Sequence, residues 1–233
     1  MIPTPNLSHL TAKDFERVYE PAEDTFLLLD ALENDAEDLK SSLPLICLEI
    51  GSGSGCVSAF IGTLLGPSSA LYLCTDINTH ACQCTVATGR QNKVCLESVG
   101  TYLDRSLHTR LKHCVDLLVF NPPYVPTNSV EAESAQTSPA IASAWAGGVN
   151  GMELTNTFLK LAPVGLLEEN PRELLAPQGR FYLVAVKENN IPNILATMLN
   201  EHNLAGKVVL RRRAGREHLH ILRFEKQASQ VQT

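Results

Sequence analysis

The sequence lacks the features of a membrane or secreted protein. No stretch approaches the roughly 18 consecutive apolar residues that a membrane-spanning helix needs. Residues 1–10 do not join a basic segment to an apolar one, as a secretion signal does. We therefore expect a soluble protein that does not associate with membranes and resides in the cytoplasm, with the nucleus as a further compartment open to it.

Basic residues are also scarce. The 19 Lys and Arg residues face 25 Asp and Glu residues, which leaves a net charge of −6 and a pI near 5.6. This balance argues against a dedicated duplex-DNA protein, because DNA binding depends on neutralising phosphates. The basic cluster Arg211, Arg212, Arg213 and Arg216 is explained most simply as a solvated surface, and its alternative is contact with a tRNA-shaped or ribosomal partner.

The seven cysteines lack the pattern of a disulfide framework or a metal site. Their number is odd, and most stand inside apolar runs, where a reduced thiol packs as a small hydrophobic side chain. Cys82 and Cys84 have no common zinc spacing, and His218 and His220 lack further ligands. The sequence therefore predicts free thiols and no metal site.

Apolar runs and amphipathic stretches alternate along the chain, which is typical of β-α-β units. The predicted strands are residues 45–50, 71–75, 94–99, 115–120, 180–186, 207–212 and 218–224. The predicted helices are residues 22–39, 55–65, 80–91, 156–167 and 192–203. The first four strands are almost continuously apolar, as in a parallel sheet covered on both faces. The last two are separated by a short segment with Gly215 and should form an antiparallel hairpin.

This layout resembles the class I, Rossmann-like methyltransferase fold: a seven-stranded, mostly parallel sheet with a C-terminal antiparallel hairpin. We expect one domain over residues 1–233, with residues 1–20 as an N-terminal extension and residues 226–233 as a frayed tail. Residues 126–144 are rich in Ser, Thr, Ala and Pro, and we interpret them as a loop on the substrate side or as a tolerated insertion.

A glycine-rich turn follows the first predicted strand. Glu49 stands two residues before the run Gly51-Ser52-Gly53-Ser54-Gly55, which leads into a helix. Glycines permit a close backbone approach, and a helix N-terminus presents unpaired N–H groups to a ligand. The G-x-G-x-G spacing favours S-adenosylmethionine over a dinucleotide, and a purely structural turn is the remaining alternative.

An acid at the end of the second strand supports the same interpretation. Asp76 is followed by Ile77 and lies about 25 residues after Gly51, where a carboxylate can accept both hydroxyls of an adenosine ribose. The alternative is an ordinary helix N-cap.

The most specific motif is Asn121-Pro122-Pro123-Tyr124, directly after the fourth predicted strand. Two prolines lack N–H groups, so this rigid turn is rich in acceptors. It suits a planar NH2 group, as in glutamine, adenine or cytosine, whose lone pair is delocalised. The Asn121 side-chain oxygen and the Pro122 carbonyl can each accept one N–H, which aims the nitrogen at an electrophilic methyl, while Tyr124 stacks on the planar group.

Together these motifs resemble the HemK family of release-factor glutamine methyltransferases over nearly the whole chain. The run Val18-Tyr19-Glu20-Pro21-Ala22-Glu23-Asp24-Thr25 and the run Trp145-Ala146-Gly147-Gly148-Val149-Asn150-Gly151 resemble its short eukaryotic and archaeal branch. The resemblance implies methylation of the Gly-Gly-Gln glutamine of the eukaryotic class I release factor in translation termination. It also implies a small zinc-binding activator subunit, paired with the edge strand at residues 94–99, since an uncovered edge strand promotes aggregation.

The resemblance also assigns site residues. It places Asn121, Pro122 and Tyr124 in catalysis, and Trp145 and Pro123 beside the substrate, although Trp145 has simple packing as its alternative. The expected cofactor-binding residues are Tyr19, Pro21, Thr25, Glu49, Gly51, Ser52, Gly53, Gly55, Asp76, Ile77, Tyr102, Leu103, Asp104 and Asn121. The family's adenine-binding Asp-Leu pair falls on Tyr102-Leu103, so either Asp104 supplies the carboxylate after a local shift or Tyr102 stacks on the ring.

Other functions remain open at this level. Asn121-Pro122-Pro123-Tyr124 alone also permits methylation of an adenine amino group in nucleic acid, and a histone-tail lysine can enter the same groove. A scaffold that binds S-adenosylmethionine without turnover ranks last, because Asn121 is present.

Overall fold

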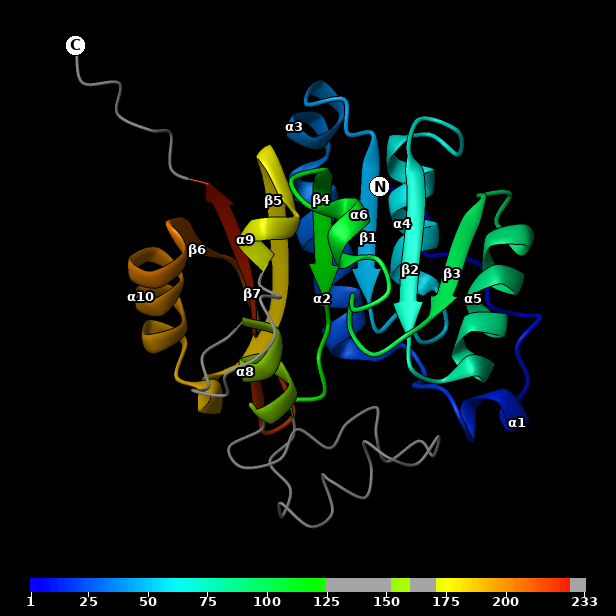
Figure 1. The fold of residues 1–233 in the computed structure, drawn as a ribbon. Coiled ribbons are helices and arrows are strands. Elements are labelled where there is room, and N and C mark those ends of the chain that lie inside the picture. The colour runs from blue at the N-terminus through cyan, green and yellow to red at the C-terminus, as the bar shows by residue number, and fades with distance from the viewer. Residues whose placement is uncertain (125–151, 160–170, 227–233) are drawn as a thin grey trace.

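The computed structural model describes residues 1–124, 152–159 and 171–226. Its centre is a seven-stranded sheet with the order β3-β2-β1-β4-β5-β7-β6 (Figure 1). The strands are β1 (Ile46–Ile50), β2 (Leu71–Asp76), β3 (Leu96–Gly100), β4 (Val115–Phe120), β5 (Leu175–Val186), β6 (Leu204–Ala214) and β7 (Glu217–Lys226). The strands from β1 to β5 pair in parallel, and β7 pairs antiparallel with both β5 and β6. The predicted mostly parallel sheet with an antiparallel hairpin is therefore confirmed.

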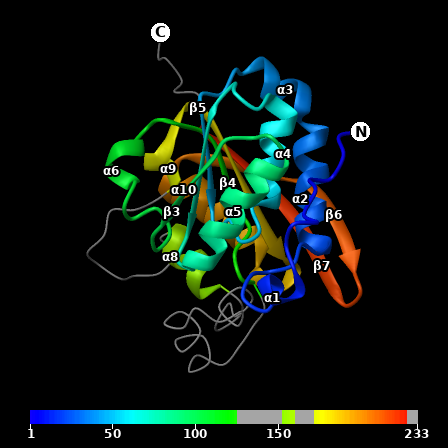
Figure 2. The same cartoon turned by 90° about the vertical axis from the view of Figure 1, so that its right-hand side faces the viewer.

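Helices cover both faces of this sheet (Figure 2). One face carries α2 (Glu23–Asn34), α3 (Ala36–Ser41), α4 (Cys56–Leu65) and α5 (Thr79–Gln91). The other carries α6 (His108–Leu111), α8 (Glu153–Leu159), α9 (Pro171–Leu174) and α10 (Ile191–His202). Two short elements, α1 (Ala12–Phe15) and the 3-10 helix η3 (Lys187–Asn189), complete the described part. No helix in this part is both long and apolar enough to cross a bilayer.

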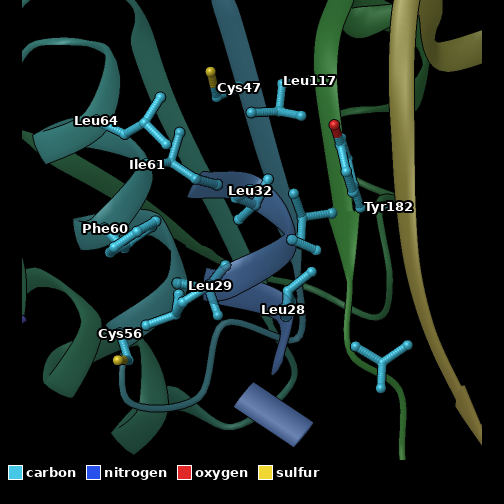
Figure 3. Close-up of a cluster of buried hydrophobic side chains, with 14 of the residues drawn as sticks. Leu28, Leu29, Leu32, Cys47, Cys56, Phe60, Ile61, Leu64, Leu117 and Tyr182 are labelled. Carbon is cyan, nitrogen blue, oxygen red and sulfur yellow. The ribbon is translucent and has the colours of Figure 1, made fainter. Parts of the chain in front are cut away.

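The core on the first face joins α2 and α4 to the central strands (Figure 3). The buried leucines of α2 point toward apolar side chains of α4, β1 and β4. The labelled members include Leu28, Leu29, Leu32, Phe60, Ile61, Leu64, Cys47 and Leu117. Because most side chains of β1 and β4 are buried, these strands read as continuous apolar runs in the sequence. All seven cysteines are free thiols.

One predicted helix is wrong in its extent. Residues 22–39 form two helices, because the helix is interrupted at Asp35 (φ −93°, ψ 10°). The Asp35 carboxylate accepts hydrogen bonds from Tyr182 Oη at 2.5 Å and Arg223 Nη1 at 2.7 Å. These partners are distant in sequence, so the local pattern does not reveal the break. Of predicted helix 156–167, residues 156–159 belong to α8, and residues 160–167 lie outside the described part.

The N-terminal segment, residues 1–20, is attached to helices by hydrogen bonds. Ile2 N–H donates to Glu33 Oε1 at 2.6 Å, and Asn6 N–H donates to Asn92 Oδ1 at 2.7 Å. Further along, Asn78 Nδ2 donates to the Arg17 carbonyl at 2.8 Å. Its last residues thereby lie over the carboxyl ends of the parallel strands.

Candidate active site

A cavity of about 330 Å³ opens at the carboxyl ends of β1, β2 and β4. Such strand ends are where ligands meet open α/β sheets. The cavity brings together most of the predicted site residues: Tyr19, Pro21, Thr25, Glu49, Gly51, Ser52, Gly53, Asp76, Ile77, Tyr102, Leu103, Asn121, Pro122, Pro123 and Tyr124. Gly55 and Asp104 are not among its lining residues. Trp145 and the predicted loop at 126–144 lie outside the described residues.

The glycine turn is shaped by positive φ angles. Gly51, Gly53 and Gly55 have φ values of +68°, +53° and +77°, which L side chains rarely adopt. At Gly55 a Cβ would lie 2.7 Å from the Cα of Thr85 in α5. Gly55 therefore permits close packing of α4 and α5, whereas Gly51 and Gly53 face the cavity.

Asp76 is held at the cavity wall by backbone donors. Gly53 N–H donates to one carboxylate oxygen at 3.0 Å, and Asn78 N–H donates to the other at 2.8 Å. Burial nevertheless raises the pKa of Asp76, because desolvation outweighs these hydrogen bonds. A carboxylate fixed in this way can accept hydroxyl donors from a ligand.

Glu49 is a buried acid at the other end of the glycine turn. Its Oε2 accepts from Ser58 N–H at 3.0 Å and from the Ser58 hydroxyl. Burial raises its pKa to about 8, against the lowering effect of these bonds, and the charge of Asp76 adds a smaller increase. Glu49 lines the cavity, where it can bind a cationic group.

The two candidates for adenine contact separate in space. Tyr102 and Leu103 line the cavity. Asp104 is buried outside the lining, and its Oδ2 lies 2.6 Å from His108 Nδ1 in α6. The geometry therefore favours contact through the Tyr102 ring and Leu103.

Asn121 is oriented by an acid that the sequence analysis missed. Its Nδ2 donates to Asp24 Oδ2 at 2.9 Å, and Asp24 is only 3% exposed. Asn121 Oδ1 is also buried and has no hydrogen-bond partner among the described residues. Asp24 stands in the first turn of α2, where an acid is expected for helix stability alone, so no local signal identifies it.

Two tyrosines and a second acid surround Asp24. Tyr19 Oη donates to Asp24 Oδ1 at 2.9 Å. Burial, and after it the charge of Asp24, raises the pKa of both Tyr19 and Tyr124, so both hydroxyls are protonated donors. Glu217 reaches the cavity wall from the start of β7, and its pKa is raised by burial and by the charges of Asp24 and Glu188. This end of the cavity therefore combines the hydroxyls of Tyr19 and Tyr124 with the acids Asp24 and Glu217.

Outside the cavity, Asp14, His80 and Cys84 place potential metal ligands within 4.8 Å of one another. The sequence spacing did not reveal this group, and His80 Nε2 already lies within hydrogen-bond distance of Asp14 Oδ1, at 3.0 Å. In the basic cluster, Arg212 pairs with Asp30 of α2 at 2.5 Å, so at least this arginine has a structural role.

These features define a methyltransferase of the class I S-adenosylmethionine-dependent fold. They are the strand order, the antiparallel β7, the glycine turn, the acid at the end of β2 and the Asn-Pro-Pro-Tyr turn after β4. No family model matches the sequence. Methyltransferase HEMK2 of Mus musculus is 51% identical over 225 residues, covering 97% of each chain. The chain belongs to the HEMK2 family of methyltransferases.

Two further relatives extend this comparison. The eRF1 methyltransferase catalytic subunit mtq2 of Schizosaccharomyces pombe is 39% identical over 236 residues, covering 96% of each chain. Among solved structures, the E. cuniculi Mtq2–Trm112 complex, responsible for methylation of the eRF1 translation termination factor, matches with a TM-score of 0.62 and 25% identity. That match covers 90% of this chain and 99% of the other.

Proposed function

We propose that this chain transfers a methyl group from S-adenosylmethionine to the side-chain amide nitrogen of the glutamine in the Gly-Gly-Gln motif of the eukaryotic class I release factor. It does so as a heterodimer with a small zinc-binding activator subunit. The names of the fission yeast relative and of the E. cuniculi complex support the release factor as the substrate and an assembly of two proteins. Since this substrate acts on ribosomes, we place the enzyme in the cytoplasm.

The chemistry of the cavity residues fits S-adenosylmethionine. Glu49 is an acceptor for the ammonium of the methionine part, and Asp76, held by two backbone N–H groups, is an acceptor for the ribose diol. Ile77, Tyr102 and Leu103 offer apolar surface for the adenine. When bound, this cofactor supplies a methyl group made electrophilic by a sulfonium.

The unpartnered oxygen of Asn121 is the observation that carries the substrate assignment. A buried acceptor without a donor costs about 1–3 kcal/mol, which a substrate N–H recovers. With the Pro122 carbonyl it forms a pair of acceptors that suits a planar NH2 group. Both oxygens would also stabilise the positive charge that develops on the attacking nitrogen as the S–CH3 bond breaks and the neutral thioether leaves. The methylated nitrogen would then lose one proton to solvent, so the chain needs no strong base before attack.

The activator is expected on the edge strand, which was predicted at residues 94–99 and is observed as β3, two residues later at its start and one at its end. This strand ends the sheet on one side, so its outer backbone groups are free of strand partners within the described part. Glu97 and Gly100 are exposed along it. An added strand of a second protein would cover this edge.

A labelled methyl-transfer assay tests the proposal. The heterodimer and labelled S-adenosylmethionine are incubated with release factor that carries Gly-Gly-Gln or Gly-Gly-Ala, and Asn121→Ala enzyme is the control. Label on the Gly-Gly-Gln factor alone, lost with Asn121→Ala, is the expected result. Label on histone tails or on adenine in nucleic acid, with none on the release factor, would overturn the substrate assignment and leave the fold and the methyltransferase family intact.

A further inference from the structure

We propose that Asp24 is a positioning residue that sets the hydrogen-bond polarity of Asn121 and thereby selects a substrate nitrogen that donates N–H. This inference deepens the proposed function and rests on it. Asp24 and Asn121 are 97 positions apart, and α2 brings one to the end of β4, which carries the other.

The first step concerns the two ends of the Asn121 amide. The Oδ1 and Nδ2 ends have nearly the same shape, so packing alone does not choose between them. An ionised carboxylate only accepts hydrogen bonds, and the Asp24 oxygen at 2.9 Å therefore requires Nδ2 on its side. Oδ1 must then point the other way, where it remains buried and without a partner among the described residues.

The second step concerns what holds Asp24 itself. Its Oδ1 accepts the Tyr19 hydroxyl at 2.9 Å, while its Oδ2 accepts Asn121 Nδ2. Oδ1 also accepts the Thr25 hydroxyl at 3.4 Å, and the Tyr124 hydroxyl bonds to the same carboxylate. Each oxygen thus has at least one donor, and the side chain is 3% exposed. A buried carboxylate held from two sides has little freedom to rotate, and its charge strengthens both bonds.

The third step concerns the substrate. With Oδ1 facing the cavity, a nitrogen that carries N–H groups completes the site. With the amide reversed, an N–H of Asn121 would oppose an N–H of the substrate, and both donors would stay unpaired. Loss of the Asp24 charge should therefore reduce the chemical step more than cofactor binding.

A charge-exchange experiment separates this role from a structural one. In Asp24→Asn the amide of residue 24 can donate to Asn121 Oδ1 and reverse the Asn121 amide. In Asn121→Asp two carboxylates face each other. In the double variant Asp24→Asn/Asn121→Asp, residue 24 donates and residue 121 presents an oxygen to the cavity, with the wild-type net charge.

The kinetic measurement is kcat for methyl transfer by each heterodimer variant to the release factor. We expect each single variant to lower kcat on the order of 10- to 100-fold, with S-adenosylmethionine affinity within about 3-fold of wild type. The double variant should be more active than either single variant. Glu23→Gln, the neighbouring acid in the same turn with its side chain 62% exposed, is the matched control and should keep wild-type kcat. A double variant no more active than the more active single variant, or Asp24→Asn with wild-type kcat, would overturn the proposal.

A second readout does not depend on the substrate. In nitrogen-15 spectra of the heterodimer, the Asn121 side-chain amide should show slow proton exchange that becomes fast in Asp24→Ala and stays slow in Glu23→Gln. If the wild-type enzyme labels no release factor but this contrast is present, the proposed function fails and the positioning role stands. Equal exchange in wild type and Asp24→Ala refutes the positioning role whatever the substrate is.

Discussion

At the scale of single residues, the site contains two acids that are poorly solvated. Glu49 is buried and Asp76 is half-buried beside the glycine turn, and desolvation raises both pKa values. When the pKa of an acid is higher in the folded than in the unfolded state, its contribution to the free energy of unfolding decreases as the pH rises from the unfolded-state pKa to the folded-state pKa. The site is therefore least stable at alkaline pH without a ligand.

Glu49→Gln tests this point. The pKa of Glu49 rises from an ordinary 4.5 to about 8, so the unfolded chain releases this proton first as the pH increases. Between pH 4.5 and 8 we expect the free energy of unfolding of the wild type to fall, relative to Glu49→Gln, by up to about 4 kcal/mol. Urea unfolding at pH 5, 7 and 9 without cofactor measures the difference, and parallel pH curves would contradict it.

Asp76→Asn tests the ribose end. The amide oxygen can still accept from one backbone N–H, so the variant should remain folded. Loss of one charged acceptor should weaken S-adenosylmethionine binding by roughly 10- to 100-fold. Calorimetric titration measures the affinity, and a Tm near that of the wild type serves as the control. Unchanged affinity would remove Asp76 from the cofactor site.

Residues within short motifs could be predicted from the sequence, and residues joined only by folding could not. Glu49, Asp76 and Asn121 each lie at the end of a recognisable strand, and the carboxyl ends of parallel strands meet at one edge of a sheet. Asp24 and Glu217 reach the same cavity from a helix start and a hairpin, where acids are commonplace. Their significance depends on partners far along the chain, since Asp24 is 97 positions from Asn121 and Glu217 still farther from Asp24.

At the scale of elements, the contact between α4 and α5 depends on Gly55. In Gly55→Ala the new Cβ meets the Thr85 backbone, and the residue keeps a positive φ. We expect a loss of at least about 2 kcal/mol in the free energy of unfolding. Gly215→Ala is the matched control, because Gly215 also has a positive φ of +60°, but a Cβ there would have no atom within 4 Å. This variant should lose only about 1 kcal/mol in the free energy of unfolding. Equal losses in urea unfolding would show that packing against α5 is unimportant.

The break between α2 and α3 gives a second prediction at this scale. Asp35→Ala removes the acceptor of Tyr182 and leaves Glu225, at 3.2 Å, as the remaining acid paired with the buried Arg223 among the described residues. We expect a loss of about 3 kcal/mol in the free energy of unfolding. Asp38→Ala should lose less than about 1 kcal/mol, because its carboxylate is 67% exposed and 3.8 Å from Arg180. Similar urea midpoints for the two variants would disprove this role of Asp35.

The elements differ in how far their sequences predict them. The buried strand β4 is observed with its predicted limits, because its apolar run ends at the Asn-Pro-Pro turn. The break at Asp35 depends on Tyr182 and Arg223, and the helical periodicity continues across it. Local patterns therefore identify the sheet better than they identify interruptions that tertiary contacts impose.

At the scale of the whole molecule, the two edges of the sheet are not equivalent. The activator is proposed on β3, whereas β6 ends the opposite side. Val99→Asp on β3 should weaken association with the activator at least 10-fold, because a charge would be buried in the new interface. Val208→Asp on β6, where the valine is 39% exposed, should leave the affinity for the activator unchanged. Calorimetric titration of each folded variant with purified activator measures both, and equal affinities would move the interface away from β3.

The attachment of the N-terminal segment also governs how the cavity opens. Arg17, Val18 and Tyr19 line the cavity, yet most of this segment is held by hydrogen bonds to α2 and to α5 and its ends, and by a small apolar cluster with α5, rather than by the sheet. Segments with few buried contacts detach at a lower free energy than global unfolding requires. Amides of residues 12–19 should therefore exchange with deuterium faster than those of β1. We then expect the residence time of a bound cofactor to follow the lifting of this segment, while the sheet remains folded.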